Sequence, residues 1–433
     1  MNLLLVTYYF PPMGLSGVLR PLKFVKHLSE FGWKVQVLTT SPGSYYAFDE
    51  SLLDEVPTSV WVVRTSSLDP HHIGGGGGGR SQASLAGATG RSLSRMVFIP
   101  DSKIGWYPYA ASKGSGKSFQ REPDVVLATA PPWTSFLVGK RIAARYGKPL
   151  VIDYRDSWLM DAQSPQPTAV HRWIASRLEA SVIERCSAAI TVNELLREEL
   201  VSRYPGVKAR VFTIYNGYDP DDFSPLLDVP SPFTGTGNEL LRLFYMGTLY
   251  QDVNKPETLF EALRILKERY GKDELPLEVV FMGMVDKRYP ALSRKLGIGN
   301  AVRFLPYRPH REALASLLTA DAAILFVDPH PHADRHVPGK LFEYLGSGKP
   351  VLALAPARSE AARIVEENGA GKVLPPDDPW AIAECLVHWI DLKSSGRKLA
   401  GIAESSLAAF QRRNQVGMLD RILRDVMLKS SIL

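Results

Sequence analysis

The sequence predicts an α/β protein made of two doubly wound domains in tandem. Its 433 residues are roughly two to three times what one hydrophobic core usually fills. Short apolar strands alternate with helical patterns, and the alternation pauses near residue 216 and then restarts. Strands that are apolar throughout are typical of parallel sheets buried on both faces. A composition of 45% apolar and 22% charged residues is that of a globular protein.

The first domain, predicted over residues 1–215, opens with a strand-helix-strand unit. Residues 2–8 are an apolar strand, 19–31 repeat apolar residues at helical spacing, and 33–39 alternate before a Ser-Pro-Gly turn. We predict a mobile loop over about 70–120, because holding Gly74 to Gly79 in regular structure would cost much entropy. The remaining predicted elements are strands at 125–129, 150–154, 188–192 and 211–215 and a helix at 134–145.

The second domain, predicted over 241–405, repeats the pattern after a proline-rich linker at 216–240. Residues 406–433 are expected to form a C-terminal helix that packs back toward the first domain. Ligands of such folds bind at the carboxyl ends of the strands, so we expect the two domains to face a central cleft. The predicted elements are strands at 243–247, 277–282, 302–305, 322–326 and 350–354 and helices at 256–270, 311–319, 338–346 and 379–392.

The positive charge is concentrated in the first half. Residues 1–215 carry 24 Lys and Arg against 17 Asp and Glu, whereas 216–433 carry 27 against 28, for a total of +6. This imbalance indicates either an anionic partner, such as a phospholipid surface or a diphosphate-linked lipid, or simply a basic soluble face. No nucleic-acid partner is predicted. The basic residues that we expect to meet a membrane are Lys23, Lys26, Lys140, Arg141 and Arg145.

The sequence favours a cytoplasmic protein that lies peripherally at the inner face of the cell membrane. Cys186 and Cys385 stand far apart in apolar helical patterns and are predicted to be reduced and buried. The chain opens as a strand without the basic region of a signal peptide, and it has no run of about 18 apolar residues that would span a bilayer.

The segment from Val337 to Leu352 carries the most specific chemistry. Pro338 presets φ in the first turn of a helix, where free backbone N–H groups would bind a phosphate. Lys340 in that turn opposes the helix dipole unless an anion neutralises it. Glu343, one turn later, can accept hydrogen bonds from the two vicinal hydroxyls of a ribose, or it belongs to a solvated helix face. Together they predict a nucleotide diphosphate site.

These residues, followed by Gly348-Lys-Pro-Val, resemble the donor-binding motif of glycosyltransferase family 4, whose members have the GT-B fold of two Rossmann-like domains. The resemblance covers almost the whole chain, including the Asn216-Gly-Tyr-Asp219 junction. It implies that Glu343 binds the nucleotide ribose and that Lys255 and nearby amides bind the diphosphate. It also implies retention of configuration, with no metal and no other cofactor. The donor-binding residues that we predict are Gly247, Thr248, Lys255, Pro338, Gly339, Lys340, Leu341 and Glu343.

The chain departs from the family pattern at two charged positions. Arg335 replaces the glutamate that the family places eight residues before Glu343, and Thr248 replaces an arginine after Gly247. We therefore predict that Arg335 supplies the missing phosphate charge. Lys255 precedes a proline where the family commonly has a glycine.

The first domain is predicted to hold the acceptor. Arg155 and Asp156 follow a strand at the place where family-4 enzymes often present a histidine, so we predict a catalytic role for them together with Arg335. Alternatively, Arg155 and Asp156 form a structural ion pair. An aromatic ring on the neighbouring rim suits stacking on a sugar or an isoprenoid. The predicted acceptor-binding residues are Gly14, Gly17, Arg20, Pro132 and Trp133.

Three other motifs suggest different chemistry. His330, His332, Asp334 and His336 alternate in one loop, but tetrahedral metal sites usually take ligands from separate elements, so we favour a polar donor-site loop and predict no metal. Lys113 to Ser118 resembles a P-loop, but Ala111 stands where a glycine is required. Neither domain has a G-x-G-x-x-G sequence after its first strand, which disfavours a dehydrogenase.

We therefore expect transfer of a sugar from a nucleotide diphosphate-sugar donor to a lipid-linked or glycan acceptor, in the synthesis of a glycan, cell-surface polysaccharide or glycolipid. Lys255, Lys340 and Arg335 would neutralise the charge that develops on the leaving diphosphate. Two alternatives stay open. One is a nucleotide-sugar 2-epimerase, supported by Asp153, Asp156 and Glu343, and the other is a catalytically degenerate sugar-nucleotide-binding protein.

Overall fold

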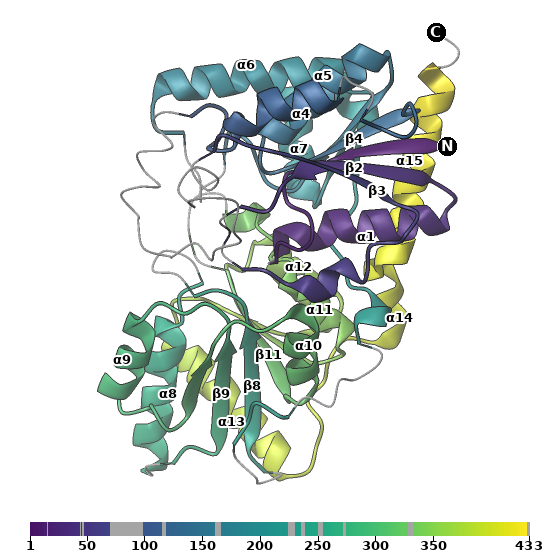
Figure 1. Cartoon of the computed structure of the whole chain (residues 1–433). Helices are drawn as coiled ribbons and strands as arrows, with labels where there is room; N and C mark the ends of the chain where they lie inside the picture. Colours follow the sequence, from purple (N-terminus) through teal and green to yellow (C-terminus); the bar gives the residue numbers. More distant parts are fainter. Residues whose placement is uncertain are drawn as a thin grey trace. The chain divides into compact units, whose positions relative to one another are not determined.

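The computed structural model divides the chain into two compact units (Figure 1). The first unit comprises Met1–Asn216 and Arg412–Leu433, and the second comprises Gly217–Gln411. The second unit is therefore inserted into the chain of the first. The structure describes residues 1–14, 16–43, 45, 47–69, 98–114, 118–160, 166–223, 230–234, 239–249, 254–271, 274–327, 329 and 333–430.

The first unit is built on a parallel sheet in the order β3-β2-β1-β4-β5-β6-β7. The order reverses between β1 and β4, because the chain winds outward from β1 on one side and from β4 on the other. This is the topological switch point, where ligands of doubly wound folds bind. The strands are β1 (Asn2–Val6), β2 (Lys34–Thr40), β3 (Trp61–Thr65), β4 (Val125–Ala130), β5 (Leu150–Tyr154), β6 (Ala188–Thr191) and β7 (Val211–Thr213).

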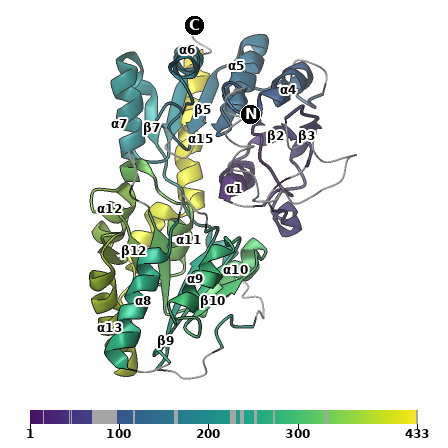
Figure 2. The ribbon, with the colours of Figure 1, turned by 90° about the vertical axis from the view of Figure 1, so that its left-hand side faces the viewer.

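Helices cover both faces of this sheet, α4 to α7 on one face and α1 and α15 on the other (Figure 2). The C-terminal helix α15 packs on α1, and Trp33 donates its indole N–H to Asp420 of α15 at 2.7 Å. Val416, Leu419 and Leu423 of α15 are fully buried. The helices are α1 (Ser16–Glu30), α4 (Tyr107–Gly114), α5 (Thr134–Tyr146), α6 (Ala169–Arg185), α7 (Glu194–Arg203) and α15 (Arg412–Ser430).

The second unit has a parallel sheet in the order β10-β9-β8-β11-β12-β13, with its switch point between β8 and β11. Helices α8 and α13 cover one face, and α10 and α11 lie on the other (Figure 2). The strands are β8 (Leu241–Met246), β9 (Leu277–Met282), β10 (Val302–Leu305), β11 (Ala322–Phe326), β12 (Val351–Leu354) and β13 (Gly371–Leu374). The helices are α8 (Glu257–Tyr270), α9 (Arg288–Lys295), α10 (His310–Leu318), α11 (Lys340–Gly346), α12 (Glu360–Glu367), α13 (Pro379–Ser394) and α14 (Glu404–Leu407).

Several helices begin at sequence signals. Asn193 caps α7 by accepting the N–H of Leu196 at 2.8 Å, and Asp378 caps α13 by accepting the N–H of Ala381 at 2.9 Å. These side chains satisfy donors that the first helical turn leaves unpaired. No helix in the described part of the chain combines the length and the hydropathy needed to cross a bilayer.

The predicted α/β class with two doubly wound sheets is confirmed. The predicted loop over 70–120 is wrong for residues 104–114, which form the 3-10 turn η2 (Ile104–Trp106) and helix α4. Trp106 anchors this segment, because it is fully buried and donates to the hydroxyl of Thr65 at 2.7 Å. The glycines from Gly74 to Gly79 lie outside the described residues.

The predicted linker at 216–240 is partly structured. Pro220–Asp222 form the 3-10 turn η4, and Phe233 packs its ring 6.4 Å from that of Phe244. The backbone N–H of Thr234 donates to the buried carboxylate of Glu278 at 3.0 Å, which ties this segment to β9. From Gly217 onward, the described part of the segment therefore belongs to the second unit.

Candidate active site

The strongest candidate site lies at the switch point of the second unit. Strands β8 and β11 are neighbours there, and the chain leaves their carboxyl ends in opposite directions. Gly247 follows β8, and the segment after β11 leads to Lys340 at the start of α11. Such a divergence opens a crevice between the two loops, into which side chains from both can reach.

Only glycine fits at the end of β8. Gly247 has φ of +130°, and a Cβ atom there would stand 2.5 Å from the Nζ atom of Lys340. Gly283, after β9, has φ of +148°, and its Cβ atom would meet the carbonyl oxygen of Gly247 at 2.1 Å. Both positions need a backbone conformation that other residues rarely adopt. Gly247 therefore makes room for the amine of Lys340.

A chain of hydrogen bonds holds that amine in place. Lys340 Nζ donates to the hydroxyl of Tyr245 at 2.7 Å and lies 4.1 Å from the centre of the same ring. The Tyr245 hydroxyl donates to the carbonyl of Thr248 at 3.0 Å, and the side-chain amide of Asn254 donates to that carbonyl at 3.1 Å. The lysine is thus coupled to the loop that follows β8.

Burial lowers the pKa of Lys340 to about 7, and the nearby carboxylate of Glu343 acts in the opposite direction. Desolvation disfavours the ammonium form, whereas a nearby negative charge stabilises it. An arriving anion would therefore return this amine to its charged form.

Glu343 lies one turn along α11 from Lys340, and its Oε1 atom is 2.8 Å from Nε2 of His310. A carboxylate can only accept, so Nε2 is the donor in this pair. Both side chains are 13% exposed, which leaves part of the carboxylate open to a ligand. His310 was not predicted as a site residue, because a histidine at the start of α10 gives no signal in the sequence of a contact with Glu343.

The start of α11 differs from the prediction. The helix begins at Lys340 with Gly339 as its cap, so Pro338 stands two residues before the first helical residue. The N–H of Leu341 donates to the carbonyl of Pro338 at 3.0 Å, and the N–H of Phe342 donates to that of Gly339 at 3.2 Å. These two amides already have partners, and the side chain of Leu341 is fully buried. The side chain of Leu341 therefore packs in the core, and its contact with the donor stays a prediction.

Three other predicted donor residues have defined positions, and their roles stay predictions. Lys255 is exposed just before α8, and Thr248 uses its carbonyl to accept the bonds from Tyr245 and Asn254. Arg335 ends the 3-10 turn η5 (Ala333–Arg335) and is half-buried. His330 and His332 of the suggested metal loop lie outside the described residues.

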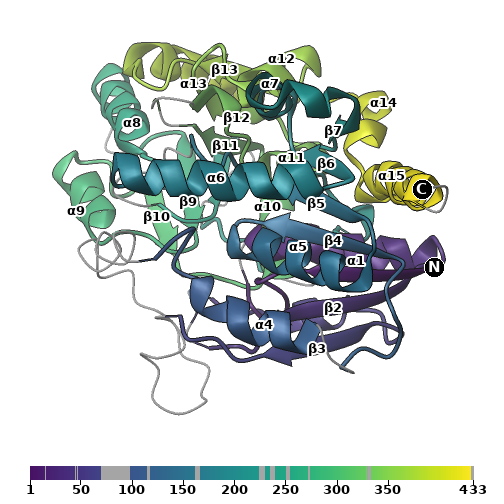
Figure 3. The same cartoon turned by 90° about the horizontal axis from the view of Figure 1, so that it is seen from above.

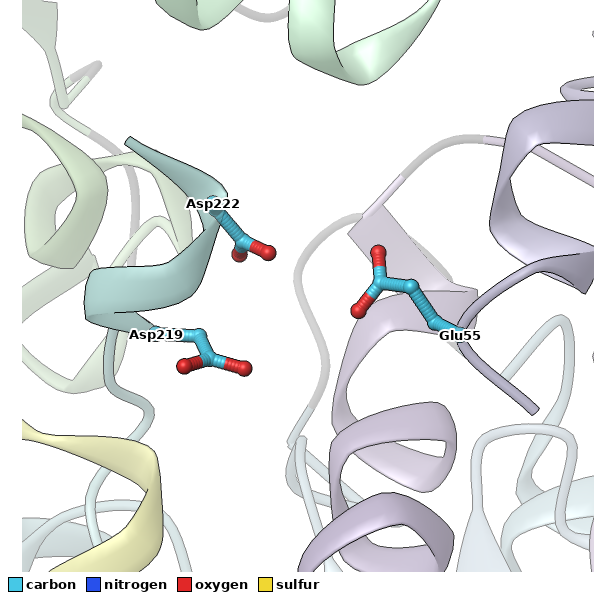
Figure 4. Close-up of side chains that lie close together, drawn as sticks. All are labelled: Glu55, Asp219 and Asp222. Atoms are coloured by element: carbon cyan, nitrogen blue, oxygen red, sulfur yellow. The ribbon is translucent and has the colours of Figure 1, made fainter. Parts of the chain in front are cut away.

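Figure 4 draws three carboxylates, those of Asp219 and Asp222 from the second unit and that of Glu55 from the first. In the second unit, Asp219 caps η4, which contains Asp222, and accepts the N–H of Asp221 at 3.3 Å. In the first unit, Glu55 accepts a hydrogen bond from the ammonium of Lys23 at 2.5 Å. Within either unit taken alone, the described residues contain no three His, Cys, Asp or Glu side chains close enough to share an ion.

At the switch point of the first unit, the predicted acceptor residue Arg20 is fully engaged. It is 2% exposed and forms a salt bridge with Asp153, in which Arg20 Nη2 lies 2.8 Å from a carboxylate oxygen. Its remaining N–H groups donate to the carbonyls of Ile214 and Tyr215 and to the side chain of Asn216. A guanidinium has five N–H donors, and these partners use all of them. Arg20 therefore supports the sheet, and its role as an acceptor ligand stays a prediction.

Arg155 likewise bonds to backbone. Its guanidinium donates to the carbonyls of Gly17 at 2.6 Å, Ala130 at 3.2 Å and Pro131. The alternative of an ion pair with Asp156 is not realised among the described residues. Arg155 thus joins the first turn of α1 to the end of β4, and a catalytic role for Arg155 and Asp156 stays a prediction.

Trp133 is a core residue and not an open stacking platform. Only 6% of its side chain is exposed, and its ring stacks on Trp158 with centroids 5.0 Å apart and planes 6° apart. Pro132 beside it is buried. Both residues therefore pack in the core, and their contact with the acceptor stays a prediction. The N–H of Gly14 donates to the carbonyl of Ala47 at 2.9 Å. The acceptor-binding roles of Gly14 and Gly17 stay predictions.

Comparison with known proteins extends the picture. A family model described as Glycosyltransferase Family 4 matches residues 22–222, and one described as Glycosyl transferases group 1 matches 241–391. D-inositol 3-phosphate glycosyltransferase of Corynebacterium urealyticum is 25% identical over 59% of this chain and 61% of its own length. The chain thus spans about three fifths of that relative. Glycogen synthase of Mycobacterium tuberculosis is 25% identical over 75% of this chain and 72% of its own.

Solved structures agree on the architecture. Anabaena HepE, crystallised in complex with UDP and glucose, superposes with a TM-score of 0.62 at 15% identity, over 98% of this chain and 100% of that one. The two family models follow one another along most of the chain, the first over β2 to β7 and the second over β8 to β13. The protein therefore belongs to the group 1 glycosyltransferases of family 4, which have the GT-B fold.

Proposed function

We propose that the protein transfers a sugar from a nucleotide diphosphate-sugar to an acceptor, with retention of anomeric configuration. The observation that carries the proposal is that the buried amine of Lys340 and the partly exposed carboxylate of Glu343 lie one turn apart on α11. This turn lies at the switch point of the second unit. A diphosphate needs a positive charge, and a ribose needs an acceptor for two hydroxyls. The likeness to HepE, solved with UDP and glucose, supports a nucleotide-sugar donor.

In this proposal Glu343 accepts hydrogen bonds from the ribose hydroxyls, and His310 keeps its carboxylate oriented. Lys340 neutralises the charge that grows on the diphosphate as the bond to the sugar breaks. Lys255 and Arg335 are proposed as additional phosphate ligands. The acceptor supplies the nucleophile, and the first unit holds it.

The acceptor is proposed to be a lipid-linked saccharide or glycan reached from the cytoplasmic face of a membrane. The first unit carries 29 Lys and Arg against 19 Asp and Glu, and the second carries 22 against 26. The resulting charges of +10 and −4 support an anionic surface as the partner of the first unit. Lys23 is removed from the expected membrane contacts, because it is 2% exposed and paired with Glu55.

We propose that no metal ion takes part. Transfer should then continue in excess EDTA, measured as nucleoside diphosphate released from the donor in the presence of acceptor. Complete loss that only a divalent ion restores would contradict this.

The test of the function is a panel of UDP-, GDP- and TDP-sugars with lipid-linked acceptors. We expect free nucleoside diphosphate and a glycosylated acceptor to form together. NMR of the product would determine the anomeric configuration of the transferred sugar. An epimerase would alter the sugar nucleotide without any acceptor. A degenerate binding protein would bind the donor, and a calorimetric titration would detect it, without any turnover.

A further inference from the structure

Helix α6 has an unusual distribution of side chains. Glu179 on its inner face is fully buried, whereas Trp173 and Val170 on its outer face are 60% and 64% exposed. A surface helix normally buries apolar residues, as α6 does with Ala175, Val182 and Ile183, and exposes charged ones. Glu179 and Trp173 depart from that pattern. The outward tryptophan therefore calls for an explanation beyond folding.

The buried glutamate has its own partners within the first unit. It accepts hydrogen bonds from the hydroxyls of Tyr154 at 3.2 Å and Tyr204 at 2.9 Å, and from the guanidinium of Arg203 at 3.0 Å. This network ties α6 to β5 and α7. The inner face of α6 is therefore held both by this network and by the buried Ala175, Val182 and Ile183, and Trp173 lies outside these contacts.

The charge around Trp173 is positive. The exposed Arg172 is its neighbour in sequence, and the guanidinium carbon of Arg177 lies 5.7 Å from the centre of its ring. The sequence contains no Asp or Glu from residue 162 to residue 178. We call Val170, Arg172, Trp173 and Arg177 the Trp173 face.

The Trp173 face has basic neighbours. Helices α4, α5 and α6 run side by side over one face of the sheet (Figure 3), and α5 exposes Arg141 and Arg145. Because α6 follows β5, its first turns belong to the edge of the sheet where the parallel strands end. In a doubly wound domain this is the edge at which ligands bind.

Another exposed tryptophan shows that exposure alone does not define such a surface. Trp380 at the start of α13 in the second unit is 65% exposed. Its neighbours are acidic, with Asp377 exposed and Glu384 paired with Arg269 at 2.5 Å. The two tryptophans match in exposure and differ in the sign of the surrounding charge.

We propose that the Trp173 face docks the protein on an anionic phospholipid bilayer. This rests on the proposed membrane contact of the first unit and names the surface that makes it. A tryptophan ring combines apolar area with an N–H group and suits the interface between lipid and water. Arginines can lay their aliphatic stems along that interface and direct their charge to lipid phosphates.

The experiment is co-sedimentation of the full chain with vesicles of phosphatidylcholine alone or mixed with phosphatidylglycerol. Wild type should bind the mixed vesicles and lose binding as salt rises. Trp173→Ala should lower the partition coefficient roughly tenfold, because the apolar surface of one large side chain is lost from the interface. Trp173→Phe should recover most of the binding, and Trp380→Ala, the matched control, should bind like wild type.

Equal losses for Trp173→Ala and Trp380→Ala, or none for Trp173→Ala, would overturn the proposal. So would equal binding of wild type to both kinds of vesicle. A concentration-dependent dimer in sedimentation equilibrium that Trp173→Ala dissociates would assign the face to a second copy instead. Calorimetric titration with nucleoside diphosphates separates the two proposals, because a failed donor site leaves vesicle binding intact and a failed Trp173 face leaves nucleotide binding intact.

Discussion

The two switch points use their polar side chains in opposite ways. In the first unit, Arg20 and Arg155 direct their guanidinium groups to Asp153 and to backbone carbonyls, where they join the strand ends. In the second unit, Lys340 donates to the buried hydroxyl of Tyr245, and Glu343 accepts a hydrogen bond from the partly exposed His310. The same position in a doubly wound sheet can therefore serve folding or ligand binding, and only the hydrogen-bond partners distinguish the two uses.

The largest expected effect is a loss of stability at the switch point of the first unit. Arg20→Ala leaves the fully buried Asp153 without its counter-ion, which should destabilise the protein by about 3–5 kcal/mol. Urea unfolding measures this. The control is Arg413→Ala, whose exposed pair with Glu30 should contribute no more than about 1 kcal/mol. A stable Arg20→Ala protein with a raised acceptor KM would return Arg20 to the acceptor site.

At the switch point of the second unit, where we propose the donor site, we expect substitutions to lower the affinity for nucleoside diphosphate with little loss of stability. Glu343→Ala should weaken nucleoside diphosphate binding by about 1.5–3 kcal/mol, because a charged acceptor for the ribose hydroxyls is removed. Calorimetry measures the dissociation constant. Glu312→Ala, on the exposed side of α10, is the control and should bind like wild type. Unchanged affinity in Glu343→Ala would remove the ribose role.

The pH dependence of binding tests the amine. With a pKa of about 7 in the free protein, Lys340 is mostly neutral at pH 8 to 9, whereas a bound diphosphate favours the ammonium. Binding should therefore take up a proton, and affinity should fall by up to about tenfold per pH unit as the pH rises above 7. Calorimetry in buffers of different ionisation enthalpy counts the protons. Lys340→Met should abolish the uptake, and the same uptake in this variant would contradict the assignment.

The same shift changes stability. The pKa of Lys340 in the folded protein lies below its ordinary value of 10.5, so the unfolded chain binds more protons between about pH 7 and 10.5. The free energy of unfolding should therefore rise with pH across that window. Lys340→Met should flatten this rise, which urea unfolding at several pH values can measure.

The smallest effect is expected for the group that holds the amine. Tyr245→Phe removes the hydroxyl between Lys340 and the carbonyl of Thr248 and should cost about 1 kcal/mol of diphosphate affinity. Binding of the nucleoside alone should not change. Tyr289→Phe, whose hydroxyl contacts Arg288 at 2.6 Å, is the matched control. Equal losses for nucleoside and diphosphate would show that Tyr245 only supports the fold.

The central strands were predictable because parallel strands buried on both faces are apolar at every position. The strand patterns of β1, β4, β8 and β11 therefore appear directly in the sequence. The edge strands β3 and β13 were missed, because they are partly exposed and mix polar with apolar residues.

The proximity of Lys340 and Glu343 was predictable because they lie three residues apart on one helix, where spacing alone places them together. The contacts that decide the other residues join distant parts of the chain. Arg20 meets Asp153 across 133 positions, and His310 meets Glu343 across 33. Such pairings follow from the sheet order, and no local pattern encodes them. The burial of Trp133 against Trp158 escaped prediction for the same reason.

The return of the chain to the first unit has a consequence for synthesis on the ribosome. The second unit closes on itself, because the N–H of Tyr218 donates to the carbonyl of Phe410 at 2.9 Å. It can therefore fold as soon as residue 411 has emerged. The first unit, although its sheet is made earlier, must wait for α15, since Trp33 and the apolar surface of α1 stay uncovered until residues 412–430 arrive. The unit that begins first is thus the last to be completed, and in the interval its exposed surface is the natural target for chaperones.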